Sequence, residues 1–390
     1  MNTPDPQSPL LSAGFSRRRF LGASLAAVGG LAGSQLLAAC GSGAGSGSGS
    51  AGSDEVVALG WSSYVDSNIA AIMAKAGVNM KGVPAETDQE MFTKIKAGGG
   101  SSYDIVFCNC GWSPTYYKSG LVEAFDAKSV PGWEKIWPIF LETASLPYIV
   151  EPYKVTMFPN TFDSYGLIWN TETPFQPTEP YSWMTLWDDA VPKGKRVLKG
   201  GPEDFLAMSG LSLGVPKEEI FAMTGDTLQK AAQHLADLKP FQISPSDEIF
   251  EDALVSEKAW IGMCTQLAAG PRLNAHEGKE LAKAVIPKEG SIGWIDGPQI
   301  VANAKNRAGA LKFIEVWNSK EVQDYLWTTY GFSPCNSDMT KQILDGGGEG
   351  AQNLKNLGGD KPENATQLVF QGPPDNPEEW TKAYDQIVGA

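Results

Sequence analysis

The sequence predicts an α/β protein of two lobes, and three features carry this expectation. From residue 54 onward, short apolar segments alternate with segments of helical period, as in a mostly parallel sheet covered by helices on both faces. The 337 residues from Asp54 to Ala390 are enough for two domains of ordinary size. The segment 155–169, VTMFPNTFDSYGLIW, has the character of a strand that leaves one lobe and enters the next.

The first 40 residues have the features of an export signal. Arg17, Arg18 and Arg19 precede an apolar, small-residue run that ends at Ala39, which is typical of a twin-arginine signal peptide. Leu37-Ala38-Ala39-Cys40 has the pattern of a lipobox, in which Cys40 becomes the lipidated first residue. A membrane-spanning helix is the alternative, since a span needs roughly 20 apolar residues. The many Gly, Ala and Ser residues and the terminal Cys favour a cleaved signal and a lipid anchor outside the membrane.

Residues 41–53, GSGAGSGSGSAGS, predict a flexible linker between that anchor and the folded body. A Gly/Ser coil of 13 residues has an end-to-end distance of roughly 20 Å. The chain after residue 40 contains 28 basic and 44 acidic residues, so its net charge is −16. This charge disfavours nucleic acid and anionic lipid headgroups as partners and favours cationic ligands.

The first predicted lobe begins with three strands separated by helices. The expected elements are a strand over 55–60, a helix ending near Lys75, a strand over 78–83, a helix over 88–97 and a strand over 103–107. Ligands of such sheets bind beyond the carboxyl ends of the strands. Trp61, Tyr64, Asn109 and Trp112 follow two of these strands and are therefore candidate site residues. For Trp61, the alternative is an indole in the core of the lobe.

The second lobe is predicted to hold a strand over 196–198, a loop over 199–203 and a helix over 204–214. Asp204 at the start of this helix is a candidate ligand. The alternative is a helix-terminal charge favoured by the helix dipole, which contributes about 0.3 to 1 kcal/mol. A further strand over 259–266 contains Thr265.

The segment 289–317, EGSIGWIDGPQIVANAKNRAGALKFIEVW, combines two strands, a turn and an amphipathic helix. Side chains two residues apart share one face of a strand, so Trp294 and Asp296 would lie side by side. An indole face attracts a cation by roughly 0.5 to 2 kcal/mol, and a carboxylate adds a charge-assisted hydrogen bond. The pair therefore predicts a cation site. Alternatively, Trp294 belongs to the core and Asp296 begins a turn before Gly297-Pro298.

This segment, E-G-S-x-x-W-x-D followed by an apolar strand, A-K-N and a helix, resembles the polyamine-type, spermidine/putrescine-binding branch of the bacterial extracellular solute-binding proteins. So do W-x-x-Y at 61–64, the Y-D-I-V strand at 103–106, S-W-x-x-L-W-D at 182–188 and G-F-x-P-x-N at 331–336. The resemblance implies a periplasmic-binding-protein type II fold with a hinge of crossing strands. It places 54–158 and 295–338 in the first lobe, and 159–294 and 339–390 in the second.

In that family, the ligand lies in the cleft between the lobes and is held by aromatic and acidic side chains. The resemblance implies these ligand-binding residues here: Trp61, Tyr64, Asn109, Trp112, Asp204, Thr265, Trp294 and Asp296. Asp296 would bind an ammonium group, and the aromatic rings would stack on the methylene chain. The sequence departs from the family at three places. Gly111 and Trp112 stand in place of the usual Ser and Tyr pattern, Gly200 or Gly201 stands where a second acidic residue is expected, and Thr265 stands where an aromatic residue is common.

Cys108, Cys110, Cys264 and Cys335 remain beside Cys40, and an exported protein can form two disulfides from four cysteines. Three pairings are open. We expect a bond from the loop of Cys108 and Cys110 to Cys335, because both belong to the predicted first lobe. A metal site is not expected, since Cys-x-Cys lacks the usual zinc spacing and neither histidine has a partner at ligand spacing.

The sequence thus predicts a lipid-anchored substrate-binding protein of an ABC importer, expected to be monomeric and to deliver a small organic cation to permease and ATPase subunits. No catalytic residue and no cofactor are expected, because no nucleophile elbow or His-based triad is recognisable. Two alternatives remain open. One is the same fold with a sugar, amino acid or other small solute as ligand, and the other is an exported hydrolase with paired carboxylates.

Overall fold

The structure of the chain is a computed structural model, and it describes residues 55–98 and 101–388. The predicted signal peptide, the lipidation site Cys40 and the linker 41–53 lie outside the described residues. Within the described part of the chain, every helix is too short or too polar to cross a bilayer.

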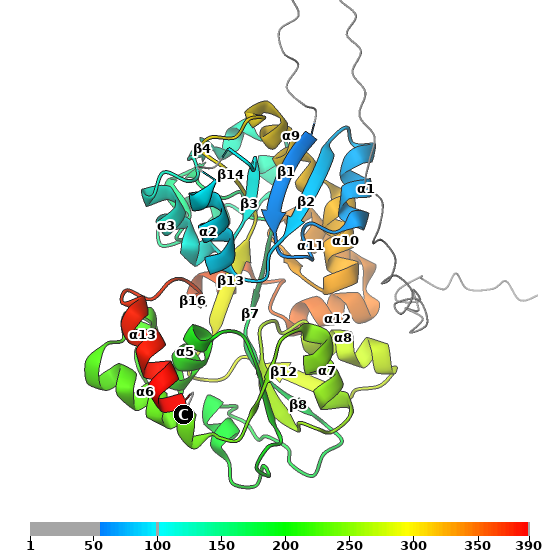
Figure 1. The fold of residues 1–390 in the computed structure, drawn as a ribbon. Coiled ribbons are helices and arrows are strands. Elements are labelled where there is room, and N and C mark those ends of the chain that lie inside the picture. Colours follow the sequence, from blue (N-terminus) through cyan, green and yellow to red (C-terminus); the bar gives the residue numbers. More distant parts are fainter. Residues whose placement is uncertain (1–54, 99–100, 389–390) are drawn as a thin grey trace, which may run out of the picture. The chain divides into compact units, whose positions relative to one another are not determined.

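The first sheet has the strand order β14-β3-β1-β2 (Figure 1). Strand β1 pairs in parallel with β2 and β3, and β14 pairs antiparallel with β3. Its strands and the helices that follow or cover them are β1 (Glu55–Gly60), α1 (Ser67–Lys75), β2 (Asn79–Pro84), α2 (Asp88–Ala97), β3 (Ile105–Phe107), β14 (Pro298–Ile300) and α9 (Arg307–Trp317). The strand and helix order predicted for 55–107 is confirmed.

Burial and capping explain why these residues form these elements. Strand β3 is apolar throughout and fully buried, as expected of a central strand covered on both faces. Asp66 and Thr87 cap α1 and α2 by accepting hydrogen bonds from first-turn N–H groups. On the inner face of α9, Trp317 packs on Phe107 with ring centroids 4.6 Å apart.

The second sheet has the order β10-β9-β11-β8-β12. Its strands are β8 (Gly166–Asn170), β9 (Arg196–Lys199), β10 (Gln242–Ser244), β11 (Ile261–Cys264) and β12 (Ala282–Val285). Its helices are α5 (Pro202–Ser212), α6 (Gly225–Asp237), α7 (Asp247–Val255) and α8 (Ala269–Glu277). Strand β9 is parallel to β10 and β11, whereas β8 is antiparallel to β11 and β12. The sheet is therefore mixed, and less parallel than predicted.

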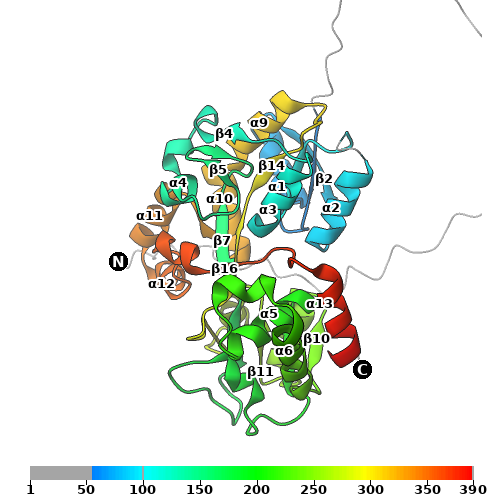
Figure 2. The same ribbon diagram turned by 90° about the vertical axis from the view of Figure 1, so that its left-hand side faces the viewer.

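A third sheet, β15-β7-β13-β16, connects the other two. Its strands are β7 (Thr161–Ser164), β13 (Ile292–Asp296), β15 (Ser333–Pro334) and β16 (Val369–Phe370). Strand β7 leads into β8 of the second sheet, and β13 leads into β14 of the first. The views in Figures 1 and 2 both place β7 between the two groups of elements. These crossing strands define a two-lobed type II binding-protein fold, which confirms the predicted fold class.

The remaining elements are short or lie at the edges. They are α3 (Ser113–Lys118), β4 (Phe125–Asp126), α4 (Ile139–Glu142), β5 (Ile149–Glu151), β6 (Lys154–Val155), α10 (Lys320–Tyr330), α11 (Ser337–Gly346), α12 (Gly348–Asn356) and α13 (Pro377–Ala383). The many glycines in residues 345–362 favour a surface loop, but α12 occupies half of this segment. Gly347 and Gly348, both with positive φ, separate α11 from α12, and buried Ala351 and Leu354 anchor α12.

The predicted lobe boundary after residue 338 falls inside α11. Helix α12 packs on α11, and α11 packs on α10. We propose that residues 337–356 stay with the first lobe and that the chain enters the second lobe after β16.

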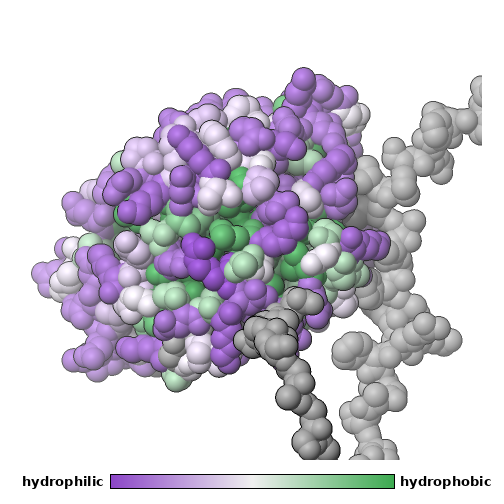
Figure 3. All heavy atoms as spheres, turned by 90° about the horizontal axis from the view of Figure 1, so that it is seen from above, coloured by the Kyte–Doolittle hydropathy of each residue, from purple (hydrophilic) through white to green (hydrophobic). Residues whose placement is uncertain are grey.

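The face seen in Figure 3 is mainly hydrophilic at its edges, with hydrophobic residues gathered toward its middle. Large hydrophobic side chains are also exposed singly on separate elements, such as Tyr117 on α3, Val150 on β5 and Ile249 on α7. Single exposed hydrophobic residues are common on soluble proteins and indicate no particular partner.

We predict that Asp104→Ala destabilises the first lobe. The Asp104 carboxylate is 4% exposed and accepts hydrogen bonds from the backbone N–H groups of Val57 and Asn306. Its removal leaves two backbone donors without this acceptor, so the free energy of unfolding should fall by about 2 kcal/mol or more in urea denaturation. Asp126→Ala is the control, because exposed Asp126 caps only a local turn. Equal losses from both substitutions would contradict the prediction.

Candidate ligand-binding site

Asp296 and Tyr64 form the centre of the candidate site. Asp296 ends the crossing strand β13 and is 7% exposed, and Tyr64 follows β1. The Tyr64 hydroxyl donates to Asp296 Oδ2 at 3.0 Å and lies 3.0 Å from Thr161 Oγ1 on β7. Asp296 Oδ1 is buried and has no hydrogen-bond partner among the described residues. This carboxylate is therefore only half satisfied by the protein.

Aromatic rings surround this centre. Trp294 donates its indole N–H to the carbonyl oxygen of Thr265 at 2.9 Å and packs edge-on against Phe332 at 5.3 Å. Phe332 also lies 5.8 Å from Tyr64, and Trp61 lies edge-on to Tyr64 at 6.1 Å. Phe332 thus connects the tryptophan of the crossing strand with the aromatic pair of the first lobe.

A second buried carboxylate, Asp88, lies near Asn109. Asp88 is in the first turn of α2, and its Oδ1 accepts the backbone N–H of Asn109 at 2.8 Å. The Asn109 side chain donates to Gln371 Oε1 at 3.0 Å, and Gln371 donates to Asp204 Oδ1 at 2.8 Å. This chain of hydrogen bonds connects the carboxyl-end loops of the first sheet with the start of α5 in the second lobe.

The surroundings of Asp204 fit both interpretations of the sequence, a helix-terminal charge and a candidate ligand residue. Its Oδ2 accepts the N–H of Gly201 at 2.8 Å, which stabilises the N-terminus of α5. The same carboxylate accepts a hydrogen bond from the Tyr165 hydroxyl at 3.2 Å, and its other oxygen binds Gln371. The helix-capping role therefore does not exclude a position facing the site.

Burial of three carboxylates raises their pKa values. Desolvation raises the pKa of Asp88 to about 7, with a smaller increase from the charge of Asp204. Desolvation likewise raises the pKa of Asp204 to about 6. The pKa of Asp296 is raised well above its usual range by burial, and next by the charge of Asp88. The charge of Asp204 thus acts on Asp88, and the charge of Asp88 acts on Asp296.

The structure brings together most, but not all, of the predicted site residues. Tyr64 contacts Asp296 directly, and Asn109 reaches Asp204 through Gln371. Thr265 contributes its carbonyl oxygen to Trp294 rather than its side chain. Trp112 packs on Phe92 of α2, with ring centroids 6.0 Å apart.

Sequence reasoning missed four residues at this site, Asp88, Tyr165, Phe332 and Gln371. Asp88 looked like the charged start of a helix. The strand-end rule could have identified it, because Asp88 lies just beyond the carboxyl end of β2. Gln371 carried no local signal, because it follows a two-residue strand at the far end of the chain.

Gly111 allows a close approach between two segments at the site. A Cβ atom at Gly111 would overlap the carbonyl oxygen of Gln371 and lie 3.0 Å from the Cα of Gly372. The glycine therefore lets the segment after β16 pass close to the Asn109 loop. This backbone contact is the physical basis of the hydrogen bond between Asn109 and Gln371.

The expected disulfide is not formed. Cys108, Cys110, Cys264 and Cys335 are all buried free thiols in the structure, so the predicted bond to Cys335 is wrong. Cys108 accepts a hydrogen bond from Gln299, and Cys264 lies in β11 beside the backbone of β8. Burial raises the pKa of each thiol and keeps it protonated. Within the described residues no group of three side chains is arranged to hold a metal ion.

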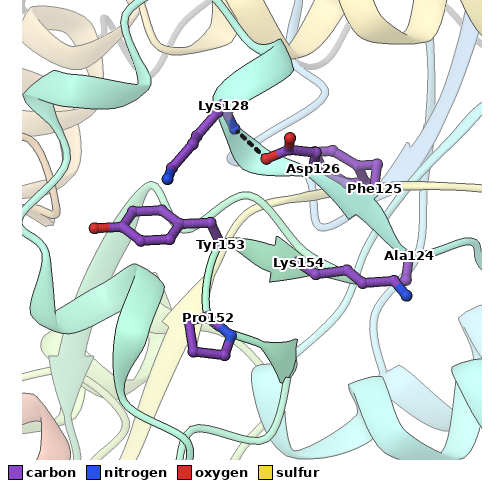
Figure 4. Close-up of a pocket in the computed structure, with 7 residues that line it drawn as sticks. All are labelled: Ala124, Phe125, Asp126, Lys128, Pro152, Tyr153 and Lys154. Carbon is purple, nitrogen blue, oxygen red and sulfur yellow. Dashed lines mark hydrogen bonds between the residues drawn. The ribbon is translucent and has the colours of Figure 1, made fainter.

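A separate surface hollow lies on the small β4-β6-β5 sheet (Figure 4). It has a volume of about 330 Å³ and is lined by Ala124, Phe125, Asp126, Lys128, Pro152, Tyr153 and Lys154. The Lys128 ammonium lies 3.8 Å from the centre of the Tyr153 ring, so this cation already has an aromatic partner. No predicted site residue lines the hollow.

Two lobes, crossing strands and a buried acidic site with aromatic walls are the features of a solute-binding protein. A model of the family described as bacterial extracellular solute-binding protein matches residues 68–347. The chain belongs to this family, whose members are exported proteins that bind solutes rather than catalyse reactions.

Individual relatives agree with this membership. The chain is 24% identical over 295 residues to spermidine/putrescine-binding periplasmic protein 1 of Haemophilus influenzae, covering 75% of this chain and 78% of the relative. It is 24% identical over 296 residues to the Escherichia coli spermidine/putrescine-binding periplasmic protein, covering 73% and 78%. The solved structure of the substrate-binding protein PotD of the Streptococcus pneumoniae spermidine/putrescine ABC transporter matches with a TM-score of 0.65 at 22% identity, covering 86% of this chain and 97% of that one. The structural likeness supports the fold.

We predict that the ligand-free protein loses stability as pH rises. Asp88 has a folded-state pKa of about 7 against about 3.9 in an unfolded chain. A raised pKa contributes stability that is complete below about pH 4 and is lost as pH rises through about 7. Asp204 acts in the same direction over a lower range, to about 6. The melting temperature should therefore fall by several degrees between pH 5 and pH 8. A melting temperature that rises over this interval would contradict the prediction.

We also predict that Gly111→Ser weakens ligand binding more than it weakens the fold. The new side chain would displace the backbone of Gln371 and break the hydrogen bond between Gln371 and Asn109. Ligand affinity should fall about tenfold, because a misplaced site contact costs on the order of 1 to 3 kcal/mol. The control is Gly346→Ser, at an exposed position with open space around it. Calorimetric titration of both variants tests this, and wild-type affinity in Gly111→Ser would contradict it.

Proposed function

We propose that this protein is the substrate-binding lipoprotein of an ABC importer and that it captures a small organic cation of the polyamine class, such as putrescine or spermidine. One observation carries the proposal: the buried carboxylates of Asp296 on the crossing strand and Asp204 in the second lobe have no basic partner among the described residues. None of the ion pairs formed within residues 55–98 and 101–388 includes Asp88, Asp204 or Asp296.

A buried carboxylate without a counter-charge is costly, so such groups are usually paired or neutralised by protonation. A bound ammonium group would supply the missing charge and donate hydrogen bonds to the unpartnered Asp296 Oδ1. Trp294, Phe332 and Tyr64 would provide apolar faces for the methylene chain between ammonium groups. The names of the Haemophilus influenzae and Escherichia coli relatives support the same ligand class.

Capture would act through contacts with both lobes. Tyr64 belongs to the first lobe and Asp204 to the second, so a ligand that touches both favours the arrangement in which the lobes approach. The arrangement with ligand bound would be the form recognised by the permease. The twin-arginine and lipobox patterns at 16–40 support export and anchoring through Cys40 to the outer face of the membrane.

A neutral sugar or an amino acid in the same cleft is the competing ligand class. Thr265 in place of an aromatic residue, and Gly200-Gly201 in place of an acidic one, favour it. A thermal-shift screen of putrescine, spermidine, basic amino acids, quaternary amines and sugars separates the classes. A ligand at a hundred times its dissociation constant adds about 2.7 kcal/mol of stability, which is visible as several degrees. A shift by sugars alone would overturn the proposal.

We predict that Asp296→Asn lowers affinity for putrescine and spermidine at least about tenfold, because it removes a buried charge that binds an ammonium group. Asparagine keeps an acceptor for the Tyr64 hydroxyl, so the fold should remain intact. The control is Asp360→Asn, which removes one acidic charge from the turn that follows α12. Calorimetric titration measures both affinities. Unchanged affinity in Asp296→Asn would remove this carboxylate from the site.

A further inference from the structure

We propose that Asp88 is a third ligand carboxylate of this site, that it selects cations with more than one ammonium group, and that cation capture releases protons from the site. This inference rests on the proposed function and adds to it the role of Asp88 in selecting the ligand and the release of protons on binding.

The position of Asp88 is not explained by its helix. Thr87 already caps α2, because its hydroxyl accepts the N–H of Glu90 at 3.1 Å. Asp88 is nevertheless 8% exposed, and its Oδ1 accepts the Asn109 N–H from outside the helix. A first-turn aspartate with no other role would favour solvent, where its charge is hydrated. Its burial at the strand ends therefore needs a partner.

Two independent observations place Asp88 with the other carboxylates. The hydrogen bonds through Asn109 and Gln371 connect it to Asp204. Its charge also acts on Asp296, whose buried Oδ1 has no partner within the described part of the chain. A buried, unpartnered carboxylate oxygen on which the charge of a second carboxylate acts favours a positively charged ligand group at this place.

The geometry of the second lobe explains why the additional acid comes from the first lobe. Gly200 has a φ of 130°, which L-residues rarely adopt, and a Cβ atom there would lie 2.8 Å from Asp204 Oδ2. The loop before α5 is therefore closed to an acidic side chain at position 200. Asp88 supplies a carboxylate from the opposite lobe. The site then has three carboxylates, which suits a ligand with two or three positive charges.

Proton release follows from the surroundings of Asp88. The titratable groups that its charge affects are Asp296, Cys108, Cys110, Tyr116 and Tyr165, and Asp204 acts on it in turn. None of these groups is basic. Without ligand, part of the carboxylate population is protonated near pH 7, and an incoming cation favours the ionised form. Affinity for a polycation should therefore rise with pH.

The test is calorimetric titration of the wild-type protein and Asp88→Asn with spermidine, putrescine and butylamine at pH 6 and pH 8, in buffers of different ionisation enthalpy. Wild type should bind spermidine about tenfold more tightly at pH 8 than at pH 6 and release on the order of one proton at pH 7. Asp88→Asn should lose about tenfold in spermidine affinity at pH 8 and release fewer protons. Its preference for spermidine over butylamine should fall as well.

Two controls separate this role from general effects of burial and charge. Asp104 is also buried, but it accepts the backbone N–H groups of Val57 and Asn306 at the start of β3, before the strand ends that carry the site. Asp104→Asn should change stability and leave the proton count unchanged. Glu90→Gln removes an exposed charge from the same helix as Asp88 and should leave both readouts unchanged.

Asp88→Glu keeps the charge and guards against a folding defect in Asp88→Asn, since it should recover the pH dependence and most of the preference for spermidine. If Asp88→Asn binds spermidine with wild-type affinity, proton count and preference, the inference is overturned and the proposed function survives. If the wild-type protein binds none of the amines, the proposed function itself fails.

Discussion

The antiparallel pairing of β7 with β13 is the interaction on which the rest of the structure depends. These two strands carry the chain between the lobes, and their register sets Thr161 opposite Asp296 and Asp163 opposite Trp294. Because alternate residues of a strand share a face, these four side chains lie on one side of the crossing sheet. The same hydrogen bonds that connect the lobes therefore position the carboxylate and the indole at the centre of the candidate site.

This arrangement makes ligand binding and lobe approach parts of one equilibrium. Buried carboxylates that lack a counter-charge oppose the compact arrangement once they ionise, and a cation between them removes that opposition. The ligand then stabilises the state in which Asn109, Gln371 and Asp204 are hydrogen bonded across the lobes. A ligand that binds the compact state more tightly than the open state is enough to shift the equilibrium toward lobe approach.

The fold could be predicted from the sequence because its signals are local. Apolar strands ending in Gly60 and Phe107, capped helices of 9 and 10 residues such as α1 and α2, and the Trp294-Asp296 spacing are each contained in a short stretch of sequence. The strand-end rule likewise identified Tyr64 and Asn109. Helix α12 was missed because its glycines suggest a loop, whereas buried Ala351 and Leu354 stabilise it through tertiary contacts. Gln371 was missed because its bond to Asn109 spans 262 residues of sequence.

Two of the three departures from the polyamine-type pattern, those at Gly111 and Gly200, have a common physical basis in the close approach of backbone segments. At Gly111 a side chain would overlap the carbonyl oxygen of Gln371, and at Gly200 a side chain would meet the Asp204 carboxylate in a conformation that L-residues rarely adopt. Each glycine thus lacks a side chain that could contact the ligand, and its small size allows a closer contact between protein segments. Asp88 lies on the other side of the Asn109 and Gln371 bridge from Asp204, so it restores negative charge without disturbing either contact. The number of acidic side chains at the site therefore depends on both lobes. The sequence of the loop before α5 is not enough to predict it.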